Sequence, residues 1–148
     1  MMNDNEVIEI KYLNKEIPKL KQTEGSDWID CYNADPDIKL KSGEHKLIPL
    51  GFACKLPKGY EAHLEARSST FKKYGLLITN SVGIIDESYC GDGDEWMLSV
   101  LATRDVEIEG YNRICQFRII KKQPTITFRE VDTLNSPNRG GFGSTGDK

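Results

Sequence analysis

The stretch NSVGIIDESY, residues 80–89, has the pattern of a β-hairpin around which the rest of the chain is organised. Its apolar run, 82–85, predicts a strand, and the triplet Asp86-Glu87-Ser88 predicts a tight turn into a returning strand. We expect the apolar side chains of this stretch to hold the hairpin against a core. These side chains are Val82, Ile84 and Ile85.

Three other side chains of the same stretch carry polar groups that a single pocket could collect. Asn80 offers an amide that can recognise the edge of a base, and Tyr89 offers an aromatic ring. Asp86 offers a carboxylate beside apolar residues, which can act as a general base. The alternative is a solvated turn aspartate in an ordinary hairpin. Residues 80–89 alone leave both interpretations open.

Composition places the chain among globular proteins with one domain. It has 148 residues, of which 38% are apolar and 29% charged, and a net charge of −3. A negative balance argues against a nucleic-acid or anionic-membrane surface, because both need a clustered cationic face. No apolar run approaches membrane-spanning length, and the first residues lack a secretory leader. We therefore expect a cytoplasmic protein with no nucleic-acid or membrane partner.

The cysteines and histidines do not predict a zinc site. Four cysteines are widely separated without a CxxC pair, and only two histidines could join them. We expect reduced thiols that are mostly packed, with Cys90 in a turn as the most reactive. No histidine falls in the segments that carry chemistry, so a Ser-His-Asp triad is not expected either.

The hydrophobic pattern along the chain predicts an all-β fold. Only residues 69–74, STFKKY, have the pattern of a helix. About a dozen short strands with close turns indicate a β-sandwich or barrel. Besides the hairpin, the predicted strands are 7–13, 28–32, 38–41, 46–50, 51–56, 60–67, 75–79, 96–104, 106–108, 113–120 and 125–131. We expect a barrel domain over residues 1–134 and a flexible glycine-rich arm over 135–148.

The arm has the composition of a segment that binds a nucleotide. Its segment GFGSTG, 141–146, matches the letters of a dinucleotide fingerprint but lacks the strand before it and the helix after it. Glycine backbone and hydroxyl groups there can still surround an anion, Arg139 can pair with a phosphate, and Phe142 can cover a base. A disordered tail would have no need of this set.

Two more segments favour phosphate binding without deciding it. Arg67-Ser68-Ser69 follows a predicted strand and precedes the predicted helix, which suits an anion; the alternative is that a serine merely caps the helix. Gln116 interrupts the apolar positions of strand 113–120, so its amide either bonds to backbone or faces a pocket.

Together these segments resemble the trimeric dUTPase family, whose members hydrolyse dUTP to dUMP and pyrophosphate. The resemblance covers nearly the whole chain and is closest to the enzymes of Bacillus-type bacteria and their phages, which share a GDGDEW-like insert. Five motifs stand in family order: WIDCYNA (28–34), ARSST (66–70), NSVGIIDESYCG (80–91), RICQF (113–117) and RGGFGSTG (139–146).

The resemblance implies a fold, an assembly and a mechanism. The fold would be a jelly-roll-like β-barrel, assembled as a homotrimer in which the C-terminal arm is exchanged between subunits. Asp86 would activate the attacking water. Mg²⁺ would be the cofactor, held mainly by the triphosphate and waters rather than directly by protein ligands.

The resemblance also assigns the remaining site residues. Asn80, with the hairpin backbone and Ile85, would bind uracil, and Tyr89 would pack on the deoxyribose. The phosphates would be held by Arg67, Ser68, Ser69 and Gln116. The arm would close with Arg139, Phe142, Gly143, Ser144 and Thr145. Asp30 would support the site.

Two departures from the family pattern and two rival functions stay open. Asp27-Trp28 stands where the family usually has Ala-Gly. In the segment DGDEW, 92–96, Asp92, Asp94 and Glu95 are interpreted as a solvated acidic turn rather than a cation site, and Trp96 as a core residue. The rivals are a dCTP deaminase, or a bifunctional enzyme of the same fold, and a non-catalytic nucleotide-binding regulatory module. A regulatory protein partner is not identified by the sequence.

Overall fold

The computed structural model describes residues 5–143, which form eleven strands and one helix. The elements in chain order are β1 (Glu9–Tyr12), β2 (Ile29–Tyr32), β3 (Asp37–Leu40), β4 (His45–Pro49), β5 (Phe52–Lys55), β6 (Tyr60–Glu65), α1 (Thr70–Tyr74), β7 (Leu76–Ile78), β8 (Gly83–Ile85), β9 (Met97–Ala102), β10 (Val106–Glu109) and β11 (Arg113–Lys121). Outside the hairpin at 80–89, all predicted strands up to 113–120 are present, with ends shifted by a few residues.

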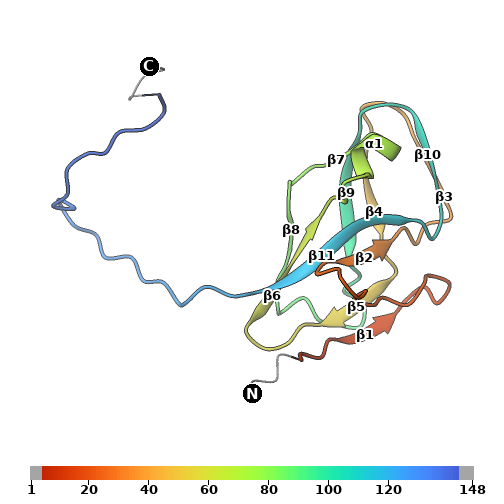
Figure 1. The fold of residues 1–148 in the computed structure, drawn as a ribbon, viewed down its shortest axis with the longest axis horizontal. Helices are drawn as coiled ribbons and strands as arrows, with labels where there is room; N and C mark the ends of the chain where they lie inside the picture. Colours follow the sequence, from red (N-terminus) through yellow and green to blue (C-terminus); the bar gives the residue numbers. More distant parts are fainter. Residues whose placement is uncertain (1–4, 144–148) are drawn as a thin grey trace.

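The strands pair in four small antiparallel sheets whose order mixes early and late parts of the chain. The sheet orders are β1-β5, β10-β3, β2-β11-β6-β8 and β4-β9-β7. Thus β2 lies beside β11, β3 beside β10 and β4 beside β9, so the sheets close around a common interior (Figure 1). This nested pairing is that of a jelly-roll-like barrel and confirms the all-β prediction.

Side-chain alternation along the strands builds the core. On β9, Leu98 and Val100 are buried, whereas the intervening positions point outward. Trp96, directly before β9, is fully buried, with its ring centroid 4.9 Å from that of Phe52 and 5.0 Å from that of Phe117. The prediction that Trp96 belongs to the core is therefore confirmed.

The helix α1 confirms the prediction for residues 69–74. It stops at Gly75, whose backbone is left-handed with φ 65° and whose N–H donates to the carbonyl of Phe71. A Cβ atom at Gly75 would lie 2.9 Å from Cγ of Arg104, so both the conformation and the space require glycine. This stop turns the chain directly into β7.

The predicted hairpin at residues 80–89 is wrong, although its first strand exists. β8 pairs with β6, and no strand follows Ile85 until β9 begins at Met97. The reason is local: the segment YCGDGDE, 89–95, has no alternating apolar positions. Its backbone groups form hydrogen bonds with near neighbours in sequence instead, for example from Tyr89 N–H to the carbonyl of Asp86. Ile84, expected in the core, is half-exposed, whereas Ile85 packs against the core.

The predicted strand 125–131 is also wrong. After β11 the chain leaves the barrel as an extended arm (blue in Figure 1), and residues 121–143 are all exposed. The apolar pattern is real, but no strand among residues 5–143 borders the segment, so Phe128 is left 93% exposed. Alternation with a period of two shows that residues suit a β-strand, but it does not identify the strand with which they would pair.

The cysteines match the prediction of reduced, mostly packed thiols. All four are free; Cys31, Cys54 and Cys115 are buried and Cys90 is exposed. Burial raises the pKa of the Cys54 thiol to about 12, which makes this buried thiol inert. No helix within residues 5–143 is long and apolar enough to cross a membrane.

Candidate active site

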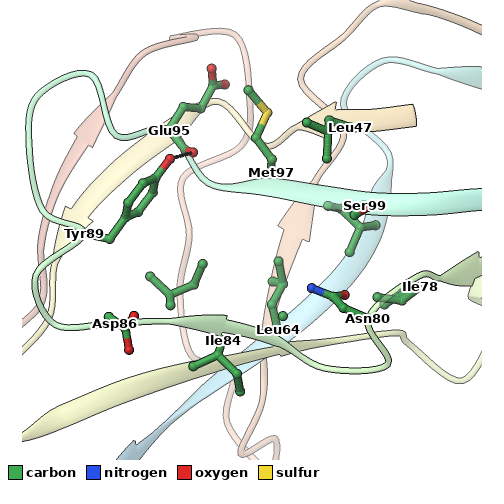
Figure 2. A pocket seen from close by; sticks show the side chains of 13 residues that line it. Leu47, Leu64, Ile78, Asn80, Ile84, Asp86, Tyr89, Glu95, Met97 and Ser99 are labelled. Carbon is green, nitrogen blue, oxygen red and sulfur yellow. Dashed lines mark hydrogen bonds between the residues drawn. The ribbon is translucent and has the colours of Figure 1, made fainter. Parts of the chain in front are cut away.

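One pocket of about 290 Å³ collects the polar residues of the stretch 80–89. Asn80, Asp86 and Tyr89 all line it. Figure 2 shows Asn80 at one end, Asp86 and Tyr89 at the other, and Leu64 between them. The remaining lining residues are mostly apolar: Leu47, Ile78, Gly83, Ile84, Ile85, Glu95, Met97, Leu98 and Ser99. The pocket can therefore enclose a planar, mostly apolar group and bond its polar edge.

Local backbone geometry places these side chains. Between β7 and β8 the chain turns tightly, with Val82 N–H donating to the carbonyl of Asn80 at 2.6 Å and Ser81 held at φ 59°. β8 then lies so close to β6 that a Cβ atom at Gly83 would be 3.2 Å from Cβ of Leu64. Glycine at this position thus lets the strand carry Asp86 to the rim of the pocket.

A second polar group forms where β2, β11 and the entry to α1 meet. The Arg67 guanidinium donates through Nε to Oδ1 of Asp30 at 2.9 Å, and through Nη1 to Oγ of Ser69 at 3.3 Å. Ser69 occupies the N-cap position of α1 but makes no capping hydrogen bond. The capping interpretation is therefore wrong for Ser69, whose hydroxyl meets an arginine instead; Ser68 is exposed beside it.

Gln116 belongs to the same group. It stands opposite Asp30 in the β2–β11 ladder and opposite Glu65 in the β11–β6 ladder. Its Nε2 donates to the carbonyl of Ala66 at 3.1 Å, which is the backbone partner that one of the two sequence interpretations anticipated.

Sequence reasoning missed Arg113, which completes this group. Its Nε lies 3.4 Å from Oδ2 of Asp30, so the two oxygens of one carboxylate hold two arginines. A side-chain hydrogen bond with Tyr32 raises the pKa of Arg113 above its ordinary value, with the Asp30 charge adding to the effect. The available signal was an arginine heading the motif RICQF, but its partner appears only once β2 and β11 are paired.

The two groups do not meet within one chain. None of Asp30, Arg67, Ser68, Ser69 and Gln116 lines the pocket of Asn80, Asp86 and Tyr89. The described part of the arm, 135–143, does not bridge them either, because it runs away from the barrel (Figure 1), and Arg139, Phe142 and Gly143 in it are exposed. Ser144 and Thr145, the last two predicted lid residues, lie outside the described residues.

The acidic turn differs from both of its sequence interpretations. Asp92 is solvated, 92% exposed at its side chain, whereas Asp94 and Glu95 are half-buried and accept hydrogen bonds from backbone N–H groups. Within residues 5–143 no three His, Cys, Asp or Glu side chains are grouped so that they could hold a metal ion. The turn is thus a hydrogen-bonded structure, and only Asp92 is a solvated charge.

Comparison with known proteins identifies the family. The family model described as dUTPase matches residues 17–146, which span both polar groups and most of the arm. The chain belongs to the dUTPase family. The resemblance inferred from the five motifs is thereby confirmed. The matched residues include both the pocket of Asn80, Asp86 and Tyr89 and the polar group around Asp30.

Individual dUTPases extend this finding. The SPbeta prophage-derived deoxyuridine 5′-triphosphate nucleotidohydrolase of Bacillus subtilis strain 168 is 51% identical over 141 residues, covering 95% of this chain and 99% of the relative. This relative confirms the expected likeness to Bacillus-type phage members. The deoxyuridine 5′-triphosphate nucleotidohydrolase of Finegoldia magna is 37% identical over 145 residues, covering 94% and 99%.

Solved structures agree on the fold. The dUTPase of Staphylococcus bacteriophage 80alpha, solved with dUPNHPP, matches with a TM-score of 0.78 at 21% identity, covering 97% of this chain and 100% of that chain. The dUTPase of Streptococcus mutans matches with a TM-score of 0.69 at 21% identity, covering 80% and 99%. The barrel is therefore that of a dUTPase.

Proposed function

We propose that this chain hydrolyses dUTP to dUMP and pyrophosphate, which keeps uracil out of DNA and supplies dUMP for thymidylate synthesis in the cytoplasm. The observation that carries the proposal is the convergence of Asn80, Asp86 and Tyr89 on one largely apolar pocket in a chain of the dUTPase family. Asn80, Ile85 and the backbone of β8 bind uracil. Tyr89 packs on the deoxyribose, and Asp86 faces the α-phosphate.

The cationic group holds the triphosphate. Arg67, Ser68, Ser69 and Gln116 offer N–H and O–H donors around Asp30, which keeps the Arg67 guanidinium in place. Because the donor groups lie outside the pocket, we infer that a dUTP molecule bound by both sets lies between two chains.

We infer a homotrimer with shared sites from this division. The outer face of the sheet β4-β9-β7 carries exposed Leu47, Leu77, Met97 and Leu101 on one side of the ladder, an apolar surface that suits a second copy of the chain. Residues 122–143, which lead into and form the described part of the arm, are likewise all exposed, so the arm is free to reach another chain. The pocket of one chain, the cationic group of a second and the arm of a third then complete each site.

The chemistry is an attack of water on the α-phosphorus. The water oxygen forms a bond to the α-phosphorus while Asp86 accepts a proton from that water. The bond between the α-phosphorus and the bridging oxygen breaks, and pyrophosphate leaves with the bonding electrons. Arg67 and Arg139 neutralise the charge that develops on the leaving group. Phe142, Gly143, Ser144 and Thr145 close over the nucleotide and exclude other water.

The residues of this chain fit a magnesium ion that arrives with the substrate. Both oxygens of Asp30 contact arginines, and the described residues form no cage of metal ligands. Mg²⁺ bound to the triphosphate oxygens would add positive charge next to the leaving pyrophosphate.

The substrate panel that tests this function is pyrophosphate release from dUTP, dTTP, dCTP and UTP. We expect dUTP to be preferred by at least ~10²-fold in kcat/KM over each of the others, because the pocket must exclude a 5-methyl group, a 4-amino edge and a 2′-hydroxyl. Uracil-containing products from dCTP would instead support a deaminase. Binding of dUTP without turnover would support a regulatory module.

A second prediction concerns Arg113. Arg113→Gln should raise KM for dUTP about 10-fold with a smaller change in kcat, because Asp30 then orients Arg67 without its second charged partner. The matched control is Arg118→Gln, on the same strand and paired with Asp27 at 3.2 Å, which should leave KM unchanged. Steady-state kinetics measures both; equal effects of the two variants would remove Arg113 from the site.

A further inference from the structure

The ring of Tyr89 is tied to the acidic turn by a hydrogen bond that the family motif does not predict. The Tyr89 hydroxyl donates to the backbone carbonyl of Glu95 at 2.8 Å, drawn as the dashed line in Figure 2. Tyr89 is 39% exposed and lies in a stretch without strand pairing, so core packing does not hold its ring. The backbone of Tyr89 is held as well, because its N–H donates to the carbonyl of Asp86 at 3.0 Å.

The accepting carbonyl is itself anchored to the barrel. The Glu95 carboxylate accepts a hydrogen bond from Gly51 N–H at 2.9 Å. The next residue, Trp96, is fully buried, donates its N–H to the carbonyl of Phe52 at 2.9 Å and accepts from Leu50 N–H at 3.0 Å. Side chain and following backbone thus fasten Glu95 to the segment 50–52, which enters β5.

The turn between Tyr89 and Glu95 is closed from inside. The Asp94 carboxylate accepts from Gly91 N–H at 2.8 Å, Asp94 N–H donates back to the carbonyl of Gly91 at 3.0 Å, and Glu95 N–H donates to the carbonyl of Gly93 at 2.9 Å. Hydrogen bonds from N–H groups to carboxylates are among the stronger kinds. The half-buried carboxylates of Asp94 and Glu95 therefore give a short, glycine-rich segment one preferred shape.

We propose that the turn Gly91–Glu95 is a brace that sets the position of Tyr89, and that Glu95 is thereby a positioning residue for discrimination between deoxyribose and ribose. This inference rests on the proposed role of Tyr89 against the sugar. The Tyr89 ring can exclude a 2′-hydroxyl sterically only if the ring stays in place, because a displacement of about 1 Å would make room for one oxygen atom. The bond from its hydroxyl to a carbonyl anchored at Gly51 and Trp96 resists that shift.

The test is the ratio of kcat/KM for dUTP to kcat/KM for UTP. Tyr89→Phe keeps the ring but removes the donor, and Glu95→Ala keeps the carbonyl but removes its anchor to Gly51. Each should lower the ratio at least ~10-fold, mainly through faster UTP turnover. The double variant should be no worse than the more affected single variant, because both changes release the same restraint.

Two matched variants separate the brace from general damage to the loop. Glu95→Gln retains an oxygen acceptor for Gly51 N–H and should recover most of the ratio. Asp92→Ala, in the same turn but with a 92% exposed side chain that only pairs with Lys11 at 3.9 Å, should keep the wild-type ratio. If Glu95→Ala does not fold, Tyr89→Phe and Glu95→Gln still decide the matter.

The outcomes distinguish this inference from the function on which it rests. A wild-type chain that fails to hydrolyse dUTP, or that accepts UTP equally, overturns the proposed function and the role of Tyr89. A wild-type chain that rejects UTP, with Tyr89→Phe and Glu95→Ala rejecting it just as strongly, overturns the brace alone. A double variant whose loss equals the product of the single losses also overturns it, since the two groups then act independently.

Discussion

Asp86→Asn is expected to lower kcat for dUTP about 10³-fold while nucleotide binding persists. The side chain lines the pocket beside Tyr89, and asparagine has the same size and can still form hydrogen bonds. It cannot accept the proton of the attacking water, so only the chemical step is affected. Single-turnover kinetics measures the chemical step, and calorimetry with a non-hydrolysable dUTP analogue measures binding.

The control for this variant is Asp92→Asn, an aspartate of the same loop with a 92% exposed side chain. It should hydrolyse dUTP at the wild-type rate. Near-normal turnover by Asp86→Asn would exclude Asp86 as the base, whatever the pocket looks like.

A chain ending at Leu134 should remain a folded trimer and yet lose dUTP hydrolysis by ~10³-fold, which is the scale of one arginine contact in phosphoryl transfer. The missing residues include Arg139 and Phe142, and the last strand of the barrel already ends at Lys121. Residues 135–143, the described part of the arm, are exposed and lie away from the barrel, so their removal takes away no core contact (Figure 1). The melting temperature should therefore stay within a few degrees, and weak dUMP binding should survive.

A pair of full-length variants tests whether one arm residue accounts for this loss. Arg139→Gln should reproduce most of it, whereas Arg129→Gln, an exposed arginine nearer the barrel, should not. Substantial hydrolysis by the chain that ends at Leu134 would contradict the role of the arm as a lid.

Mixing two inactive chains tests the shared site. The chain ending at Leu134 keeps Asp86, and full-length Asp86→Asn keeps the arm. If each site takes its pocket and its arm from different chains, subunit exchange produces some trimers with an intact pocket and an intact arm at one site, and dUTP hydrolysis returns. If every arm closes over its own pocket, no mixture recovers activity, and the shared-site assembly is wrong.

Local pattern was enough for much of this molecule. Alternating apolar positions predicted the strands of the barrel, and the run STFKKY before a glycine predicted α1. Trp96 is predicted to belong to the core, and it lies there fully buried. The motifs also predicted the family, because the dUTPase chemistry depends on short segments that stand in a fixed order.

Predictions that required a partner elsewhere in the chain were less complete. The returning strand after Ile85 and the strand at 125–131 both had suitable residues, but neither pairs with a strand in the part of the chain that the structure describes. Arg113 stood inside a quoted motif, yet its importance depends on Asp30, which the β2–β11 ladder brings to it.

The sequence by itself determined the family, through motifs in a fixed order, and which faces of the strands are buried, since side-chain type and period are local properties. Tertiary structure alone decided that Asp30 joins two arginines, that the pocket and the cationic group stay apart in one chain, and that Tyr89 is held by the carbonyl of Glu95. The physical reason is that strand register emerges from competition among all strands for partners. A backbone carbonyl, moreover, is chemically the same at every position. It becomes the acceptor of a particular donor only when the fold brings the two groups together.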